Sequence, residues 1–190
     1  MTSRQTPSQT AGPFFHYALS PEQGGYPFRS LADAALAEPR VAGERIRVTG
    51  SVIDGEGKPM GDVLIEVWQA DAEGRYAHPA DPRASNAAFK GFGRVATNAD
   101  GTYSFETVKP GPIGDGQAPH ITLMLFSRGM QNHLYTRIYF PDEEPANAKD
   151  PVLASVPPDR CSTLLARRTP GGYAFDIRVQ GGDETVFFDV

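Results

Sequence analysis

Hydrophobic and polar residues alternate along several short segments of this chain, which is typical of β-strands with one buried face. The alternation is clearest in residues 45–53, where Ile46, Val48 and Val52 fall on one side. Residues 63–69 are so apolar that we predict a strand inside a sheet. Residues 93–97 and 102–107 flank the turn signal Asn98-Ala-Asp-Gly101, which predicts a hairpin. Further strands are predicted at residues 120–126, 135–140, 173–179 and 184–190.

About eight short strands separated by turn residues predict an all-β fold, a β-sandwich with an N-terminal arm and one or two short helices. Residues 30–37 have a helical composition, with Ser30 as the capping residue, and residues 150–156 predict a short helical turn. Residues 1–40 carry few strand signals but five aromatic side chains. We therefore expect a single domain, in which residues 1–40 form an arm packing on a partner and residues 41–190 form the sandwich.

Composition excludes several classes of protein. Eighteen basic and 23 acidic residues give a net charge of −5, which argues against nucleic-acid binding. No apolar run approaches the ~20 residues that a membrane helix needs. The first residues lack the apolar core of a signal peptide, so we expect a cytoplasmic protein. Cys161 is the only cysteine, which excludes a disulfide framework and a cysteine-based zinc site.

Local motifs for catalysis are weak. The four histidines are not spaced as metal-ligand pairs, although carboxylates distant in sequence would be able to complete a site. The most informative run is Ala118-Pro-His-Ile-Thr122, because residues i and i+2 of a strand share one face. A His-x-His there would supply two metal ligands, but Thr122 stands in the second position.

Several separated segments, read in order, resemble the intradiol ring-cleaving dioxygenases, and the match covers nearly the whole chain. The segments are residues 6–14, 64–76, 92–94, 100–105, 107–112, 118–121, 135–140, 175–181 and 184–189. This resemblance implies a ferric iron held by two tyrosines and two histidines. Only His120 matches that set.

The other ligand positions carry different residues. Thr122 replaces the second histidine, and Ile113 stands where one tyrosine follows Pro-Gly-Pro. We place the other tyrosine in the loop at residues 77–91, which contains none, and Tyr76 belongs to the preceding turn. We therefore predict no metal site and no catalytic residue in this chain, with His120 as a vestigial ligand position.

Members of this family also occur as pairs of related chains. The resemblance implies a heteromer in which a homologous β chain holds Fe(III) and cleaves protocatechuate with O2 to 3-carboxy-cis,cis-muconate. This chain would then supply scaffold and one wall of the substrate pocket. The matching substrate-binding positions are Thr10, Gly12, Pro13 and Arg128. An arginine suits the substrate's carboxylate.

Two other interpretations remain open at this point. One is a self-sufficient dioxygenase with unusual ligands, which the missing residues disfavour. The other is a free-standing, transthyretin-like β-sandwich module that binds a small aromatic acid or another protein. Neither needs a nucleic acid or a membrane.

Overall fold

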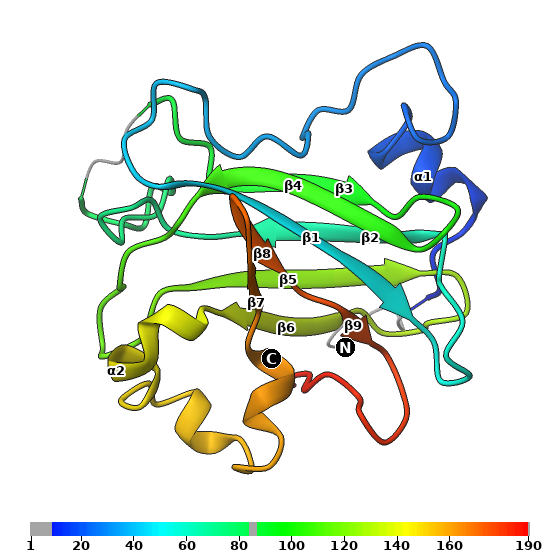
Figure 1. The fold of residues 1–190 in the computed structure, drawn as a ribbon. Coiled ribbons are helices and arrows are strands. Elements are labelled where there is room, and N and C mark those ends of the chain that lie inside the picture. Colours follow the sequence, from blue (N-terminus) through cyan, green and yellow to red (C-terminus); the bar gives the residue numbers. More distant parts are fainter. Residues whose placement is uncertain (1–8, 84–86, 190) are drawn as a thin grey trace, which may run out of the picture.

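The chain folds into two stacked β-sheets, shown by a computed structural model that describes residues 9–83 and 87–189 and leaves aside the side chains of Pro13 and His16 (Figure 1). The first sheet has the order β4 (Thr102–Val108), β1 (Arg45–Ile53), β8 (Gly172–Ala174) and β7 (Arg167–Thr169), with β9 (Ile177–Arg178) also paired to β1. The second sheet has the order β3 (Phe92–Ala96), β2 (Val63–Trp68), β5 (His120–Ser127) and β6 (Leu134–Tyr139). The predicted all-β sandwich is confirmed.

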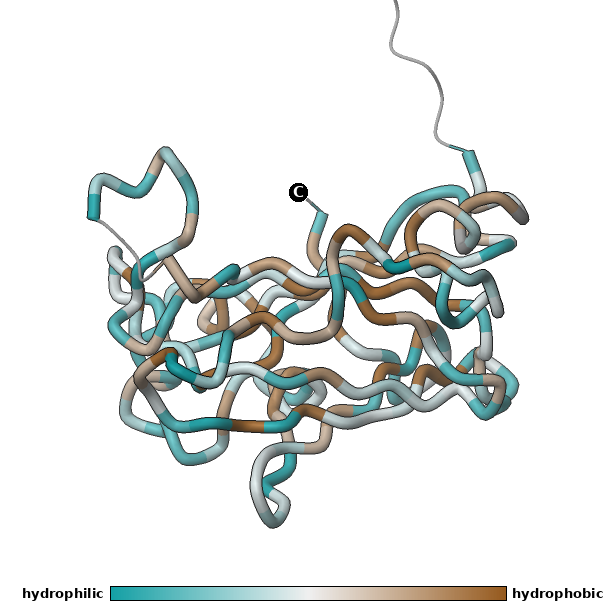
Figure 2. Tube along the Cα trace, turned by 90° about the horizontal axis from the view of Figure 1, so that it is seen from above, coloured by the Kyte–Doolittle hydropathy of each residue, from teal (hydrophilic) through white to brown (hydrophobic). Residues whose placement is uncertain are grey.

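The main hydrophobic core lies between the two sheets. In β1, Ile46, Val48 and Val52 are buried as the alternation predicts, and Val48 pairs with Phe105 of β4. Strand β2 is almost wholly buried because β3 and β5 flank it, so the prediction of an internal strand is confirmed. In Figure 2 the loops at the two ends of the strands are mostly hydrophilic in colour.

The helix predicted at residues 30–37 is wrong, because this segment is extended and runs along the edges of both sheets. The backbone N–H of Leu36 donates to the carbonyl of Glu106 on β4 at 3.1 Å, and the Leu36 carbonyl accepts from Lys90 N–H at 2.9 Å. Leu36 is fully buried in the main core. These non-local bonds outweigh the small helical preference of the sequence. We call residues 33–37 the edge strap.

Short helices fill the connections. They comprise α1 (Pro13–Leu19), α2 (Glu144–Asn147) and three 3-10 helices at Pro141–Glu143, Leu153–Ser155 and Cys161–Leu164. The helical turn predicted at residues 150–156 is thus confirmed. Among the described residues, no helix is long and apolar enough to cross a membrane.

The C-terminal part departs most from the predicted strands. Residues 173–179 form two short strands instead of one, and both pair with β1. Between them the Phe175 carbonyl approaches Gly50 so closely that a Cβ on this glycine would lie 1.8 Å from the carbonyl oxygen. Within the described part of residues 184–190, no continuous strand forms. An isolated bridge between Phe188 and Tyr135 replaces it.

Candidate functional site

The turn between β5 and β6 is held by two other parts of the chain, at the right edge of Figure 1. The hydroxyl of Ser127 donates to Asp62 Oδ1 at 3.2 Å, and Arg128 Nε donates to Asp62 Oδ2 at 2.6 Å. The N–H of Gly129 donates to Thr10 Oγ1 at 2.8 Å. Gly129 has φ = 84°, a left-handed conformation that favours glycine. Three consecutive turn residues are therefore fixed by side chains far away in sequence.

The N-terminal arm packs against this turn through α1. The ring of Phe15 lies 5.5 Å from that of Phe126, and Phe15 N–H closes a turn on the Gly12 carbonyl at 3.0 Å. A cavity of about 240 Å³ remains between arm and turn. It is lined by residues 9–12 and Phe15 on one side, and by Phe126, Ser127 and residues 130–133 on the other.

The structure brings three of the four predicted site residues to this place. Thr10 and Gly12 line the cavity, and Arg128 follows Ser127 on the facing turn. The Arg128 side chain is 67% exposed, and among the described residues none accepts a hydrogen bond from its two terminal NH2 groups. The side chain of Pro13 lies outside what the structure describes.

His120 lies elsewhere, at the start of β5. It is buried, and its Nδ1 lies 2.8 Å from the Ala118 carbonyl, to which it donates. Burial and the nearby Arg137 guanidinium lower the pKa of His120 to about 4. The imidazole is therefore neutral at pH 7.

Arg137 fills much of the polar space around His120. It pairs with Thr122 in strand register, and its Nη1 donates to Gln117 Oε1 at 2.8 Å and to the Tyr139 hydroxyl at 3.3 Å. Burial raises the pKa of Tyr139, so its phenol stays protonated. A guanidinium and a protonated phenol are not ligands for ferric iron.

Tyr76 belongs to the same corner, which sequence reasoning missed. Its ring stacks on Trp68 at 5.6 Å, Trp68 pairs with Thr122, and the charge of Arg137 acts on the Tyr76 hydroxyl. Burial is the larger effect and raises the pKa of Tyr76. The available signal was the spacing of eight positions between Trp68, on a strand, and Tyr76, in the turn that folds back over that strand.

The donor set in this corner does not fit a ferric centre. It offers one imidazole and two phenols, Tyr76 and Tyr139, whose raised pKa values keep them protonated next to a fixed positive charge that opposes a trivalent cation. Ile113, at the expected position of a tyrosine, contributes no donor atom. Over residues 9–83 and 87–189, no group of three or more His, Cys, Asp or Glu side chains is placed to hold a metal ion.

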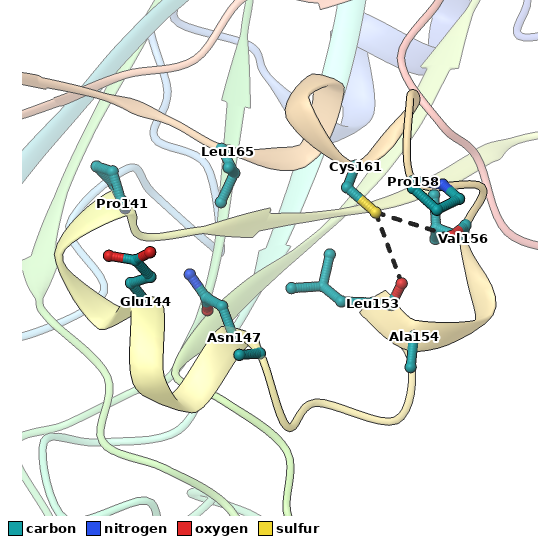
Figure 3. Close-up of a pocket in the computed structure, with 10 residues that line it drawn as sticks. Pro141, Glu144, Asn147, Leu153, Ala154, Val156, Pro158, Cys161 and Leu165 are labelled. Atoms are coloured by element: carbon teal, nitrogen blue, oxygen red, sulfur yellow. Dashed lines mark hydrogen bonds between the residues drawn. The ribbon is translucent and has the colours of Figure 1, made fainter.

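A larger cavity of about 550 Å³ lies between α2 and the 3-10 helices that follow it (Figure 3). Its lining is mostly apolar, including Pro141, Leu153 and Leu165. The Cys161 thiol points to the carbonyls of Leu153 and Val156, at 3.7 and 3.8 Å. Glu144 is the only carboxylate among the described residues that line this cavity, and the hydrogen bonds of the Cys161 thiol go to backbone carbonyls instead.

Comparisons with known proteins show the family to which this chain belongs. A family model described as dioxygenase matches residues 29–181. The α chain of protocatechuate 3,4-dioxygenase from Burkholderia cepacia is 47% identical, covering 100% of this chain and 99% of that protein. The β chain from the same organism is 40% identical over 82% of this chain and 72% of its own length. A dioxygenase domain from Streptomyces sp. SirexAA-E superimposes with a TM-score of 0.61 at 26% identity, covering 94% of this chain and 100% of that domain.

Proposed function

Because this chain belongs to the intradiol dioxygenase family, we propose that it is the iron-free subunit of a heteromeric enzyme that cleaves protocatechuate with O2 to 3-carboxy-cis,cis-muconate. A homologous β chain holds the Fe(III) on which this family depends. The observation that carries the proposal is the 47% identity to α chains over the full length of both proteins. The corner around His120 also supports the proposal, because Arg137 and Thr122 stand where a metal site would need anionic or imidazole donors.

We assign this chain's contribution to the end of the sandwich that carries Arg128. Thr10, Gly12, Pro13 and Arg128 form one wall of the partner's pocket. Arg128 compensates the substrate's carboxylate, which a buried site cannot hold without a cation or donors. The terminal NH2 groups of Arg128 support this role, since no described residue accepts a hydrogen bond from them and they match a carboxylate in a two-point geometry.

The arm supplies the contact surface for the β chain. Tyr17, Tyr26 and Phe28 pack against one another with ring centroids 4.5 to 5.9 Å apart while remaining more than 40% exposed, and we call these three residues the aromatic patch. Phe14 of the arm is 81% exposed. Large exposed apolar patches mark protein interfaces. Aromatic side chains are also the residues that most often carry binding energy.

Purification with and without the β chain tests the proposal. The isolated chain should hold no stoichiometric iron, show no visible tyrosinate-to-iron absorption and cleave no protocatechuate. The co-purified complex should hold about one iron per pair and cleave the ring. An iron-loaded, active isolated chain would refute the proposal. An isolated chain that binds an aromatic acid and never associates with a β chain would favour the free-standing module.

A further inference from the structure

We infer that Asp62 is a positioning residue for Arg128, and that it presents the arginine's terminal NH2 groups to the substrate carboxylate. This inference rests on the proposed function. Asp62 lies in the turn between β1 and β2, 66 positions from Arg128. In this role Asp62 touches no reacting atom, and it affects the substrate through the Arg128 side chain that it holds.

Asp62 uses its two carboxylate oxygens to hold two successive residues. Oδ1 accepts from the Ser127 hydroxyl and Oδ2 accepts from Arg128 Nε, so one carboxylate fixes two successive residues of the turn. The Ser127 side chain is buried, which gives this anchor a rigid base. The hydrogen bond at Nε therefore restricts the number of rotamers that the Arg128 side chain adopts.

The guanidinium of Arg128 has two edges that donate hydrogen bonds, and Asp62 uses one of them. Asp62 accepts a hydrogen bond from the Nε edge, and no residue within 9–83 and 87–189 accepts one from the edge formed by the two NH2 groups. A carboxylate that approaches that edge forms two parallel hydrogen bonds. An unpaired arginine would have to give up its rotamer freedom at the moment of binding, which weakens affinity.

The negative charge of Asp62 has an unfavourable effect as well as the favourable one of orienting Arg128. Its carboxylate also repels the substrate's carboxylate, but the Arg128 side chain is 67% exposed and that of Asp62 31% exposed. In such surroundings the repulsion at distances beyond the first contact is weak and screened by salt. We therefore expect orientation to dominate.

The test uses the reconstituted enzyme with Asp62→Ala in this chain. KM for protocatechuate should rise roughly 2- to 12-fold, which is the cost of ordering one long side chain. kcat should change little, and KM for catechol, which has no carboxylate, should also change little. Asp62→Glu keeps the charge and both acceptors and should restore part of the affinity.

Asp176→Ala is the matched control. Asp176 also divides its oxygens between a serine, here the Ser51 N–H at 3.0 Å, and an exposed arginine, Arg167 at 3.5 Å, but it lies on the other sheet. This variant should leave both substrates unaffected. It measures what the loss of any such surface pair costs the fold.

The double variant Asp62→Ala with Arg128→Ala separates positioning from support of the turn. If Asp62 acts through Arg128, adding Asp62→Ala to Arg128→Ala changes KM no further. Equal losses for catechol, an additional loss in the double variant, or a KM for protocatechuate that is unchanged or lowered would each overturn the inference. If Arg128→Ala alone has no effect on protocatechuate, the proposed function of the turn fails instead.

Discussion

At the scale of single residues, this chain has two separate clusters of polar and charged side chains. One is the corner around His120, where a neutral imidazole lies beside the cation Arg137. The other is the turn at Arg128, where a cation is exposed and held at one edge only. We propose that the second place, and not the first, binds the anionic substrate.

Replacing Arg128 by alanine should lower kcat/KM for protocatechuate in the reconstituted enzyme. The change removes a charge-assisted hydrogen bond of about 1.5–3 kcal/mol, which corresponds to roughly a 10- to 150-fold loss. Catechol should lose much less, because it carries no carboxylate, and the iron content should not change. Steady-state kinetics with both substrates measures the difference.

Arg167→Ala serves as the control, since Arg167 is equally exposed and pairs with Asp176 on the other sheet. It should leave both substrates unchanged. Equal losses for protocatechuate and catechol in Arg128→Ala would assign the residue to assembly. No loss for either would leave Arg128 as a solvated turn residue.

Protonation of His120 should make the protein less stable in acid. Its folded pKa of about 4 lies below the value of about 6.5 in an unfolded chain, so the unfolded state takes up the proton first as the pH falls. Stability from this group is complete above pH 6.5 and is lost between pH 6.5 and 4. The loss in the free energy of unfolding is up to ~3 kcal/mol.

Urea unfolding at pH 7 and pH 4.5 checks this for His120→Asn, whose amide can donate to the Ala118 carbonyl in place of Nδ1. The variant should show a smaller fall in stability over that interval than the natural protein. His133→Asn changes an exposed histidine and should leave the fall unaltered. The same pH dependence in all three proteins would rule out His120 as its source.

At the scale of elements, the arm joins the sandwich at two points of different strength. The edge strap is built into both sheets by backbone hydrogen bonds, and Leu36 is buried in the core. Upstream of it, α1 is attached mainly by Phe15 on Phe126 and by the bond between Thr10 and Gly129. The edge strap is therefore part of the folded sandwich. The weaker attachment of α1 leaves the aromatic patch exposed for contact with another chain.

Deleting residues 1–17 should therefore weaken assembly much more than folding. Loss of the Phe15–Phe126 contact, an aromatic pair of about 0.5–1.5 kcal/mol, lowers the midpoint of thermal unfolding by roughly 1–6 °C. Loss of Phe14 and Tyr17 should weaken binding of the β chain at least about tenfold. Calorimetry of the isolated chain measures the midpoint of thermal unfolding, and titration with the β chain measures the binding affinity.

The point variant Phe14→Ala accompanies the deletion, because Phe14 is exposed and its loss leaves the fold intact. It should reproduce part of the weaker binding without the change in unfolding temperature. Normal assembly and turnover by the truncated protein would remove the arm from the interface.

At the scale of the whole molecule, alternation in sequence predicted the strands well because burial between two sheets has a period of two residues. Residues 45–53 are strand β1 to the residue. The helix at residues 30–37 was predicted wrongly because the strap's hydrogen-bond partners, Glu106 and Lys90, lie more than 50 positions away. The bond between Thr10 and Gly129 spans 119 positions, so only a family resemblance linked these segments.

The edge strap also affects whether this chain, in the absence of a partner, associates with copies of itself. An open sheet ends in a strand whose unpaired N–H and carbonyl groups invite pairing with other molecules, the first step towards fibrils. Here the strap occupies such groups on both sheets, at Glu106 of β4 and at Arg94 of β3. A subunit synthesised before its partner is thereby shielded from polymerising with copies of itself. A proteolytic cut between the strap and β1 would remove that shield from both sheets at once.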